Sequence, residues 1–275
     1  MATQQRVMTM AFTASSTTDE VLAGIDLHGK TAVVTGASGG LGAETARALA
    51  SKGATVVLVA RDQGKLQQQV DAIVAATGNA AVSLELMDLA DLDSVRAAAS
   101  KIASQHPAIN ILVNNAGLMA CPLARTSRGF ESQFGVNHLG HFLFTTLLIP
   151  NLQAAAPARV IALSSGGHKI ANVDLEDPNW ERREYDKWQA YGAAKTANAL
   201  FARGLNDRFE GITANAVHPG VIMTDLARHL VKEDFAFMSM EGLNVKSVEQ
   251  GAATSVWAAT SPELEGKGGL YLEDG

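Results

Sequence analysis

The chain has 275 residues, of which 47% are apolar, and this is enough material for one large hydrophobic core. Its formal net charge of -6 argues against nucleic acid or an anionic membrane as the main partner. A single cysteine, Cys121, excludes an internal disulfide and is typical of a protein of the reducing cytoplasm.

The first 24 residues predict a mobile arm followed by a short helix. Residues 1–16 contain one basic residue and no compact apolar block, so we expect no secretory signal there. Thr17 and Glu20 have the spacing of a capping box, which would begin a helix that Gly24 ends. We expect residues 25–275 to form a single domain.

Neither a membrane span nor a metal site is predicted. The best apolar run, 142–149, is far shorter than the roughly 20 residues that a span needs, and it stops at Pro150. His138 and His141 lie one helical turn apart, but no carboxylate or third ligand accompanies them.

From residue 30 onwards, short β-branched runs alternate with longer helical patterns. This alternation is typical of right-handed βαβ crossovers, in which helices cover both faces of a parallel sheet. We therefore predict a doubly wound α/β fold. Its first strands are expected at 31–35, 54–60, 82–87 and 109–114, and the helices between them at 41–51, 64–76 and 92–104.

The first predicted strand ends in a glycine-rich turn, Thr35-Gly-Ala-Ser-Gly-Gly-Leu-Gly42. Glycine lets the backbone turn tightly near a ligand, and the helix that follows offers N–H groups to a pyrophosphate. Two known spacings fit, one through Gly36, Gly40 and Gly42 and the other through Gly36, Gly39 and Gly42. We predict a nucleotide site here, with close packing as the alternative use of the glycines.

The end of the second strand predicts which nucleotide binds. Ala60 stands where an acidic residue would accept a hydrogen bond from the ribose 2′-OH of NAD, and Arg61 follows it. Since an arginine can pair with a 2′-phosphate, we predict NADP(H), with Arg61 on that phosphate and Ser38 assisting. The alternative is that Arg61 is solvated and Asp62 caps the next helix.

Two further turns are expected to contact the nucleotide. Asp88 and Leu89 follow the third strand and should lie beside the adenine ring, because Asp91 can cap the next helix in place of Asp88. The strand order of a doubly wound sheet reverses between the first and fourth strands, so the turn at 114–117 should line the same crevice as the glycine turn. The expected contacts in that turn are Asn115, Ala116 and Gly117.

Tyr191 and Lys195 are four residues apart in a helical pattern and therefore share one helix face. A phenol titrates near pH 10, and a cation within about 4–6 Å favours its ionised form. Lys195 could thus make Tyr191 a usable general acid and base. The alternative is an ordinary amphipathic helix whose lysine reaches solvent.

Together these motifs resemble the short-chain dehydrogenase/reductase family over residues 30–273, and most of all its retinol dehydrogenase and WW-domain oxidoreductase branch and their bacterial relatives. The resemblance implies a Rossmann fold of about seven strands and favours the shorter of the two glycine spacings. Ala194 departs from the branch, which often has serine there, and the tail that often closes the site is expected to be absent after the last strand. The motifs in chain order are 35–42, Asp88, 114–117, Asn137-His-Leu-Gly-His-Phe142, Ser164-Ser165, Tyr191-x-x-x-Lys195 and His218-Pro-Gly220.

The resemblance also implies roles for four residues. Tyr191 would deliver a proton to a carbonyl oxygen, and Lys195 would hold the nicotinamide ribose and lower the pKa of the tyrosine. Ser165 would hydrogen-bond the substrate oxygen; Ser164 competes for this role, since adjacent strand residues face opposite ways. Asn137, in a helix expected at 127–148, would hold a water linked to Lys195.

Downstream, Val221 and Ile222 are expected to contact the nicotinamide carboxamide and Thr224 the pyrophosphate, with a plain turn at 219–220 as the alternative. Residues 225–243 should form a lid whose apolar residues favour an apolar or aromatic carbonyl or alcohol, although they could merely pack a helix pair. The segment 166–188 is expected to be a solvated insertion. The apolar lid residues are Leu226, Leu230, Phe235, Phe237, Met238 and Met240, and Met119, Cys121 and Leu123 would extend the same wall.

We therefore predict a cytoplasmic NADP(H)-dependent oxidoreductase that interconverts a carbonyl and an alcohol. The alanine-rich helix from 191 to 205 and the helix of Asn137 could form the interface of a homodimer or homotetramer, as in relatives. Two alternatives stay open, namely an epimerase or dehydratase that retains NAD and a non-catalytic NADP sensor.

Overall fold

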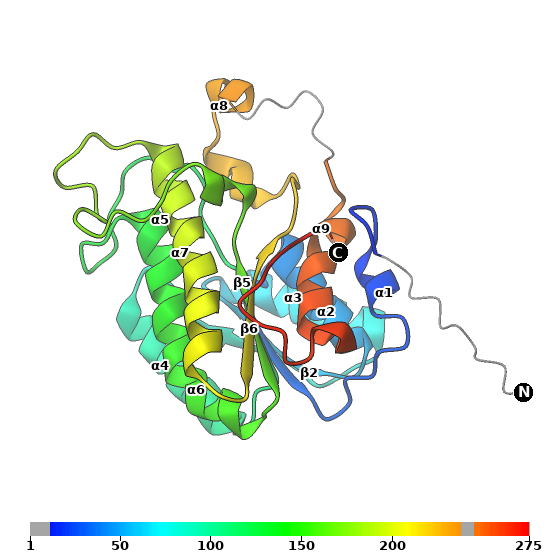
Figure 1. Cartoon of the computed structure of the whole chain (residues 1–275). Coiled ribbons are helices and arrows are strands. Elements are labelled where there is room, and N and C mark those ends of the chain that lie inside the picture. The colour runs from blue at the N-terminus through cyan, green and yellow to red at the C-terminus, as the bar shows by residue number, and fades with distance from the viewer. Residues whose placement is uncertain (1–11, 238–244, 275) are drawn as a thin grey trace, which may run out of the picture.

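The computed structural model describes residues 12–237 and 245–274. Its centre is a seven-stranded sheet in the order β3-β2-β1-β4-β5-β6-β7, with every neighbouring pair parallel (Figure 1). The predicted doubly wound sheet of about seven strands is confirmed. The strands are β1 Thr31–Thr35, β2 Thr55–Ala60, β3 Val82–Leu86, β4 Ile111–Asn114, β5 Ala158–Leu163, β6 Ile212–His218 and β7 Tyr271–Glu273.

Helices cover both faces of the sheet, as the alternating pattern predicts. One layer holds α4, α6 and α7 and the other holds α2, α3 and α9, with α1 packed on α2 and α9. Aspartates that accept first-turn N–H groups begin three of these helices: Asp62 for α3, Asp91 for α4 and Asp186 for α7. The helices are α1 Thr18–Val21, α2 Gly40–Ser51, α3 Gln63–Thr77, α4 Leu92–Gln105, α5 Ser132–Phe134, α6 His141–Ala154, α7 Lys187–Arg208, α8 Lys232–Phe237 and α9 Val248–Thr260.

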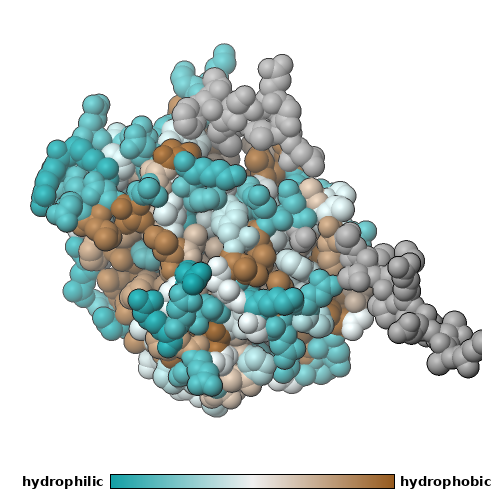
Figure 2. All heavy atoms as spheres, viewed as in Figure 1, coloured by the Kyte–Doolittle hydropathy of each residue, from teal (hydrophilic) through white to brown (hydrophobic). Residues whose placement is uncertain are grey.

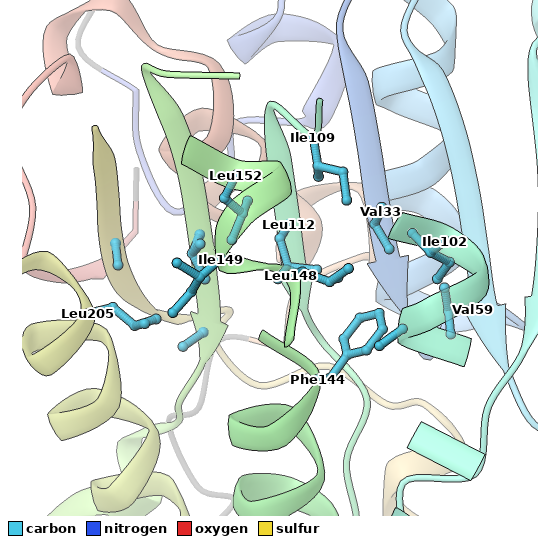
Figure 3. Packing of buried hydrophobic residues seen from close by; sticks show 14 of the residues in the cluster. Val33, Val59, Ile102, Ile109, Leu112, Phe144, Leu148, Ile149, Leu152 and Leu205 are labelled. Atoms are coloured by element: carbon cyan, nitrogen blue, oxygen red, sulfur yellow. The ribbon is translucent and has the colours of Figure 1, made fainter. Parts of the chain in front are cut away.

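The larger core lies between the sheet and the layer of α4, α6 and α7 (Figure 3). Phe144 and Leu148 of α6 are fully buried against Leu112 of β4, and Ile102 of α4 and Leu205 of α7 extend the same cluster. Continuous apolar strands such as β4 are expected where both faces of a sheet are covered. This packing fixes α7 relative to the carboxyl ends of the strands.

The helix expected at 127–148 differs in both its start and its end. It begins at α5, passes through a π-helical turn, η1 Gly135–Gly140, and continues as α6 to Ala154. Pro150 does not end it. Proline removes one backbone donor, and the Thr146 carbonyl that loses its partner belongs to an exposed residue, so water can take that place.

At the N-terminus, the predicted capping box of Thr17 and Glu20 is present at the start of α1. Arg47 of α2 bonds both Asp19 and Glu44 (2.8 and 2.7 Å), which fastens α1 to the domain. Residues 1–11 of the expected arm lie outside the described residues.

The insertion before α7 is more than a solvated face, contrary to our expectation. Trp180 is buried, with the Arg183 guanidinium 3.8 Å from the centre of its ring and the Tyr185 ring at 5.4 Å. Buried Asp177 accepts the N–H groups of Glu181 (2.7 Å) and Arg182 (3.1 Å). Charged residues in this segment therefore hold a local fold together.

Candidate active site

Two turns at the carboxyl ends of β1 and β4 lie against each other, as predicted. The Thr35 hydroxyl accepts the backbone N–H groups of Asn115 (2.9 Å) and Ala116 (3.1 Å), and the Asn115 amide donates to the Thr35 carbonyl (2.8 Å). A Cβ added at Gly36, whose φ is 68°, would lie 2.8 Å from Cα of Ala116. Only glycine allows the turns to approach so closely.

The glycine turn presents the N-terminus of α2. Gly39 is the N-cap and has no side chain with which to cap the first turn, and a Cβ added there would meet nothing within 4 Å. Gly40 has a φ of 53°, and Leu41 and Gly42 follow it in the first turn. Uncapped N–H groups at a helix N-terminus fit a pyrophosphate. Thr224 lies at this turn, since its Cγ2 would be 3.4 Å from a Cβ at Gly40.

The predicted specificity residue, Arg61, lies at the carboxyl end of β2. Arg61 is exposed directly after β2, and Ser38 in the glycine turn is half-buried. Asp62 accepts the N–H of Lys65 (3.0 Å) as the N-cap of α3. The position before Arg61 is Ala60, which offers no carboxylate to a ribose hydroxyl.

The turn after β3 holds the two residues that we expected beside the adenine ring, Asp88 and Leu89. Asp91 caps α4, as we expected, whereas Asp88 is half-buried and accepts the N–H of Ala90 (2.9 Å). Leu89 is buried and packs on Gly140 of η1. The turn therefore presents one carboxylate and one apolar side chain next to each other.

Tyr191 and Lys195 lie one turn apart in α7, and both side chains are buried. The Lys195 ammonium donates to the carbonyl of Leu163, the last residue of β5 (3.0 Å), and lies 5.6 Å from the centre of the Tyr191 ring. The tyrosine helix is thereby attached to the carboxyl end of a central strand.

The two serines after β5 have different partners. Ser165 is hydrogen-bonded to Tyr191, and its Oγ also accepts the N–H of Gly167 (3.1 Å). Ser164 is buried and donates to the Lys195 carbonyl (2.8 Å). Ser165 thus faces the phenol, whereas Ser164 joins β5 to the backbone of α7.

The pKa values correct one expectation. We expected Lys195 to lower the pKa of Tyr191, but burial raises it to about 12, and the Ser165 hydrogen bond opposes this rise. Burial also lowers the pKa of Lys195 to about 8. The reason is geometric, because the ammonium points at the Leu163 carbonyl and not at the phenol oxygen. At pH 7 Tyr191 therefore carries its proton.

Asn137 lies in the π-helical turn and not in a regular α-helix. Its side chain accepts from the Leu118 N–H (2.7 Å) and donates to the Leu118 carbonyl (2.9 Å). A Cβ added at Gly117 would lie 3.3 Å from Asn137 Oδ1 and 3.6 Å from Lys195 Nζ. A side chain at position 117 would therefore crowd Asn137 and Lys195, and glycine lets the turn lie against both.

His141 has a part in the site that our sequence analysis missed. It is fully enclosed, and burial lowers its pKa to about 4, so the ring is neutral at pH 7. Its Nδ1 donates to the Asn137 carbonyl (3.0 Å), which leaves Nε2 to accept from the Thr35 hydroxyl (2.8 Å). The ring therefore connects the glycine turn to the turn of Asn137. Its spacing from His138 pointed only to a metal ligand.

The segment after β6 lies against the turns that follow β1 and β4. The Val221 carbonyl accepts the backbone N–H of Lys246 (2.9 Å), and Ile222 packs on Gly251. Leu226 lies 3.8 Å from the position that a Cβ would take at Gly117. The expected lid is a 3-10 turn, η3 Asp225–His229, followed by α8, while Met238 and Met240 lie outside the described residues.

Asp234, Lys187 and Trp188 meet at the first turn of α7, and none of them was predicted to take part in the chemistry. Asp234 of α8 contacts Lys187 and Trp188 of α7, and no sequence spacing pointed to this meeting. Cys121, expected in the apolar wall, is buried, whereas Leu123 is exposed. Among the described residues, no three His, Cys, Asp or Glu side chains cluster closely enough to hold a metal ion.

Comparison with known proteins gives consistent matches along most of the chain. A family model described as short chain dehydrogenase matches residues 30–234. Mouse retinol dehydrogenase 13 is 44% identical over 254 residues, which is 90% of this chain and 76% of the mouse protein. A Streptomyces lividans protein named "Probable oxidoreductase" is 46% identical over 261 residues, covering 91% of this chain and 86% of that one.

Solved structures match as well. A crystal structure of an uncharacterised protein from Mycobacterium paratuberculosis has a TM-score of 0.73 and 36% identity, and the match covers 94% of this chain and 84% of that one. A short chain dehydrogenase from Escherichia coli CFT073, complexed with NADPH, has a TM-score of 0.71 and 25% identity, with 90% and 97% covered.

Proposed function

Because the chain belongs to the short chain dehydrogenase family, in the branch of the retinol dehydrogenases, we propose that it is an NADP(H)-dependent oxidoreductase that interconverts a carbonyl and an alcohol on an apolar or aromatic small molecule. The observation that supports this most directly is the group formed by Ser165, Tyr191 and Lys195. These side chains lie close to Gly117 in the turn after β4, since a Cβ at that glycine would be 3.6 Å from Lys195 Nζ.

Tyr191 is the proton donor in the direction of carbonyl reduction. With a pKa near 12 it is protonated at pH 7, and its hydroxyl gives the proton to the oxygen that becomes the alcohol. Ser165 holds that oxygen beside the phenol as negative charge develops on it. Hydride transfer at the substrate carbon is the chemistry that NADP(H) supplies when bound.

After the proton leaves, the phenolate of Tyr191 is a buried anion and needs stabilisation. The Ser165 hydrogen bond supplies it, because this bond favours the ionised phenol. The Lys195 ammonium donates to the Leu163 carbonyl and lies 5.6 Å from the centre of the Tyr191 ring. Asn137, whose side chain fixes Leu118 next to Lys195, holds this end of the crevice in place for proton exchange with solvent.

The cofactor is assigned to the crevice by the fit of the glycine turn. The α2 N-terminus, from Gly40 to Gly42, takes the pyrophosphate together with Thr224. The remaining contacts follow the family pattern, with Gly36 and Ser38 in the glycine turn, Asp88 and Leu89 at the adenine, Asn115, Ala116 and Gly117 along the crevice, Val221 and Ile222 at the carboxamide, and Tyr191 and Lys195 at the nicotinamide ribose.

Arg61 is proposed to select NADP(H) by pairing with the 2′-phosphate. The NADPH complex of the Escherichia coli relative supports this choice at the level of the fold. Arg61→Ala should raise the KM for NADPH on the order of tenfold or more, as loss of a charged hydrogen-bonded pair predicts, and leave the KM for NADH nearly unchanged. Steady-state kinetics with both cofactors measures this, and an equal change for the two would refute the assignment.

The substrate is proposed to be apolar, since the lid segment and the neighbouring wall carry Leu226, Leu230 and Cys121. The names of the relatives point the same way, because retinol is a long apolar alcohol. The test is the fall in absorbance at 340 nm when NADPH is mixed with protein and a panel of aldehydes and ketones that includes retinaldehyde. No turnover of any member, in either direction, would contradict the proposal.

A further inference from the structure

Asp234 is a buried carboxylate that three donors share. Its Oδ2 accepts from the Lys187 ammonium (2.6 Å) and the Val231 N–H (2.8 Å), and its Oδ1 accepts from the indole N–H of Trp188 (3.0 Å). The aspartate belongs to the segment after β6, and two of its partners belong to the first turn of α7. It therefore joins the two elements that flank the substrate end of the crevice.

Trp188 stands between this carboxylate and the phenol. It precedes Tyr191 by three residues, so the two side chains share one face of α7. Their rings meet edge to face, with centroids 6.4 Å apart and planes at 86°. The indole thus packs on the side of the tyrosine ring while its N–H points at Asp234.

The start of α7 does not depend on Asp234. Asp186 already caps the helix by accepting the N–H groups of Trp188 (2.8 Å) and Gln189 (2.9 Å). The amide of Gln133 also donates to the Lys187 carbonyl (2.9 Å). The backbone of the first turn is thus held by other residues, and what Asp234 adds is an anchor for two side chains.

Asp234 is charged at neutral pH. Burial opposes its ionisation, but the hydrogen bonds from Lys187, Val231 and Trp188 outweigh burial and lower its pKa. An ionised acceptor holds an N–H donor more firmly than a neutral one does. The indole therefore has one strongly favoured orientation.

We propose that Asp234 is a positioning residue that fixes the Trp188 indole beside Tyr191, so that the indole forms one wall of the substrate site and favours flat, apolar carbonyl compounds. This inference rests on the proposed oxidoreductase function. In this proposal the contact between Asp234 and Trp188 contributes to substrate selectivity. Proton transfer remains the role of Tyr191 alone.

The test compares Asp234→Ala, Asp234→Asn, Trp188→Phe and the Asp234→Ala/Trp188→Phe double variant with the wild type. Asp207→Asn is the matched control, because it breaks an exposed ion pair with Arg203 on the same helix, at the end far from Tyr191. NADPH-dependent reduction of 4-nitrobenzaldehyde, a flat aromatic probe, and of propanal, a small aliphatic probe, gives kcat and KM for each variant.

We expect Asp234→Ala and Trp188→Phe each to raise the KM for 4-nitrobenzaldehyde about tenfold, which corresponds to loss of one charged hydrogen bond, with kcat and the propanal constants within about threefold of the wild type. Asp234→Asn keeps an oxygen acceptor for the indole and should fall between these variants and the wild type. The double variant should be no worse than either single one, because both remove the same contact.

A spectroscopic measurement follows the indole without any turnover. In a Trp180→Phe/Trp257→Phe background, Trp188 is the last of the three tryptophans. Adding Asp234→Ala should shift its emission to longer wavelength and make it easier to quench with acrylamide, whereas Asp207→Asn should change neither. If Asp234→Ala does not fold, the emission of Trp188 is compared in the Asp234→Asn variant, where a smaller shift is expected.

Each outcome decides one claim. A wild type that reduces carbonyls, together with position-234 variants that match the Asp207→Asn control in KM and in emission, would overturn the role of Asp234. Equal losses for both probes, or losses in kcat alone, would also overturn it, because they indicate damage to the chemistry and not to a wall. A wild type without reductase activity refutes the proposed function instead, and the emission shift still tests the anchoring of Trp188.

Discussion

Tyr191 and Lys195 are both removed from water, and burial acts on their protons in opposite directions. The phenol holds its proton more tightly than in water, with a pKa of about 12, and the ammonium holds its proton less tightly, with a pKa of about 8. Both shifts disfavour the charged form, as a low-polarity environment requires. The site is therefore arranged as a neutral acid next to a cation whose charge is costly to bury.

The two serines after β5 should separate chemistry from packing. Ser165→Ala removes the hydroxyl that contacts Tyr191 and should lower kcat on the order of 100-fold, as loss of a donor to a developing oxyanion does. Ser164→Ala removes a bond to the Lys195 carbonyl and should cost about 1 kcal/mol of stability with little change in kcat. Steady-state kinetics and urea unfolding of both variants check this, and the reverse pattern would transfer the proposed role to Ser164.

Replacing Lys195 with methionine should abolish activity but stabilise the fold. Below pH 8 both the folded and the unfolded chain carry the lysine charge, so folding bears the cost of burying it. Between about pH 8 and 10.5 the folded chain loses this proton first, and wild-type stability rises with pH. We expect the variant to be more stable by on the order of 2 kcal/mol at pH 7, and the gain to shrink towards pH 10.

Urea unfolding of Lys195→Met and the wild type at several pH values from 7 to 10 measures that difference. The titration of Tyr191 is common to both proteins and largely cancels. A gain that stays constant over this range would show that the lysine charge is not the cause.

At the level of helices and strands, the structure follows the sequence wherever a local pattern decides it. The β-branched runs place β1 to β4 within two residues of their observed bounds, and Asp91 begins α4 as expected. Local patterns fail to predict the structure where distant partners decide it. The π-helical turn around Asn137, the continuation of α6 past Pro150 and the buried insertion around Trp180 each depend on packing that no local spacing reveals.

The same distinction holds for the site. The glycine turn, the pair of Tyr191 and Lys195 and the choice of Ser165 follow from motifs that match a family. His141 and Asp234 could not be predicted in this way, because each joins segments that lie far apart in the chain. His141 contacts Thr35 across 106 residues, and Asp234 contacts Trp188 across 46. The expected direction of the Tyr191 pKa was wrong, because the spacing of a side chain does not reveal its burial.

The glycine turn is predicted to tolerate substitution at one position and not at another. A Cβ at Gly42 would overlap the Gly36 carbonyl oxygen, whereas Gly39 is extended and has open space around it. Gly42→Ala should therefore cost about 2 kcal/mol or more through overpacking, and Gly39→Ala should stay within about 0.5 kcal/mol of the wild type. Thermal unfolding without nucleotide checks the pair, and equal effects would contradict the packing argument.

For the molecule as a whole, one face remains unusually apolar. Phe142 of α6, Leu200 of α7 and Leu175 are exposed, and they line a groove of about 680 Å³ between the two helices. Figure 2 shows hydrophobic side chains gathered over this part of the surface. No helix within residues 12–237 and 245–274 is long and apolar enough to cross a membrane. We propose that a second copy of the chain covers this face.

Leu200→Asp should accordingly weaken a dimer. Burying an unpaired carboxylate in an apolar interface is costly, so we expect the dissociation constant to rise at least 100-fold. Size-exclusion chromatography with light scattering at micromolar concentration measures the mass, with Leu86→Asp, at an exposed apolar residue of β3, as the control. A wild type that runs as a monomer would rule the proposal out.

The placement of β1 between β2 and β4 in the sheet has a consequence for biosynthesis. Its first neighbour, β2, follows soon in the chain, but its second, β4, pairs Ala32 with Ile111 and arrives much later. Non-local pairings of this kind form slowly, because a long loop must close before any contact compensates for the lost entropy. A polypeptide leaving the ribosome therefore carries its glycine turn well before it has the turn after β4 that packs against it.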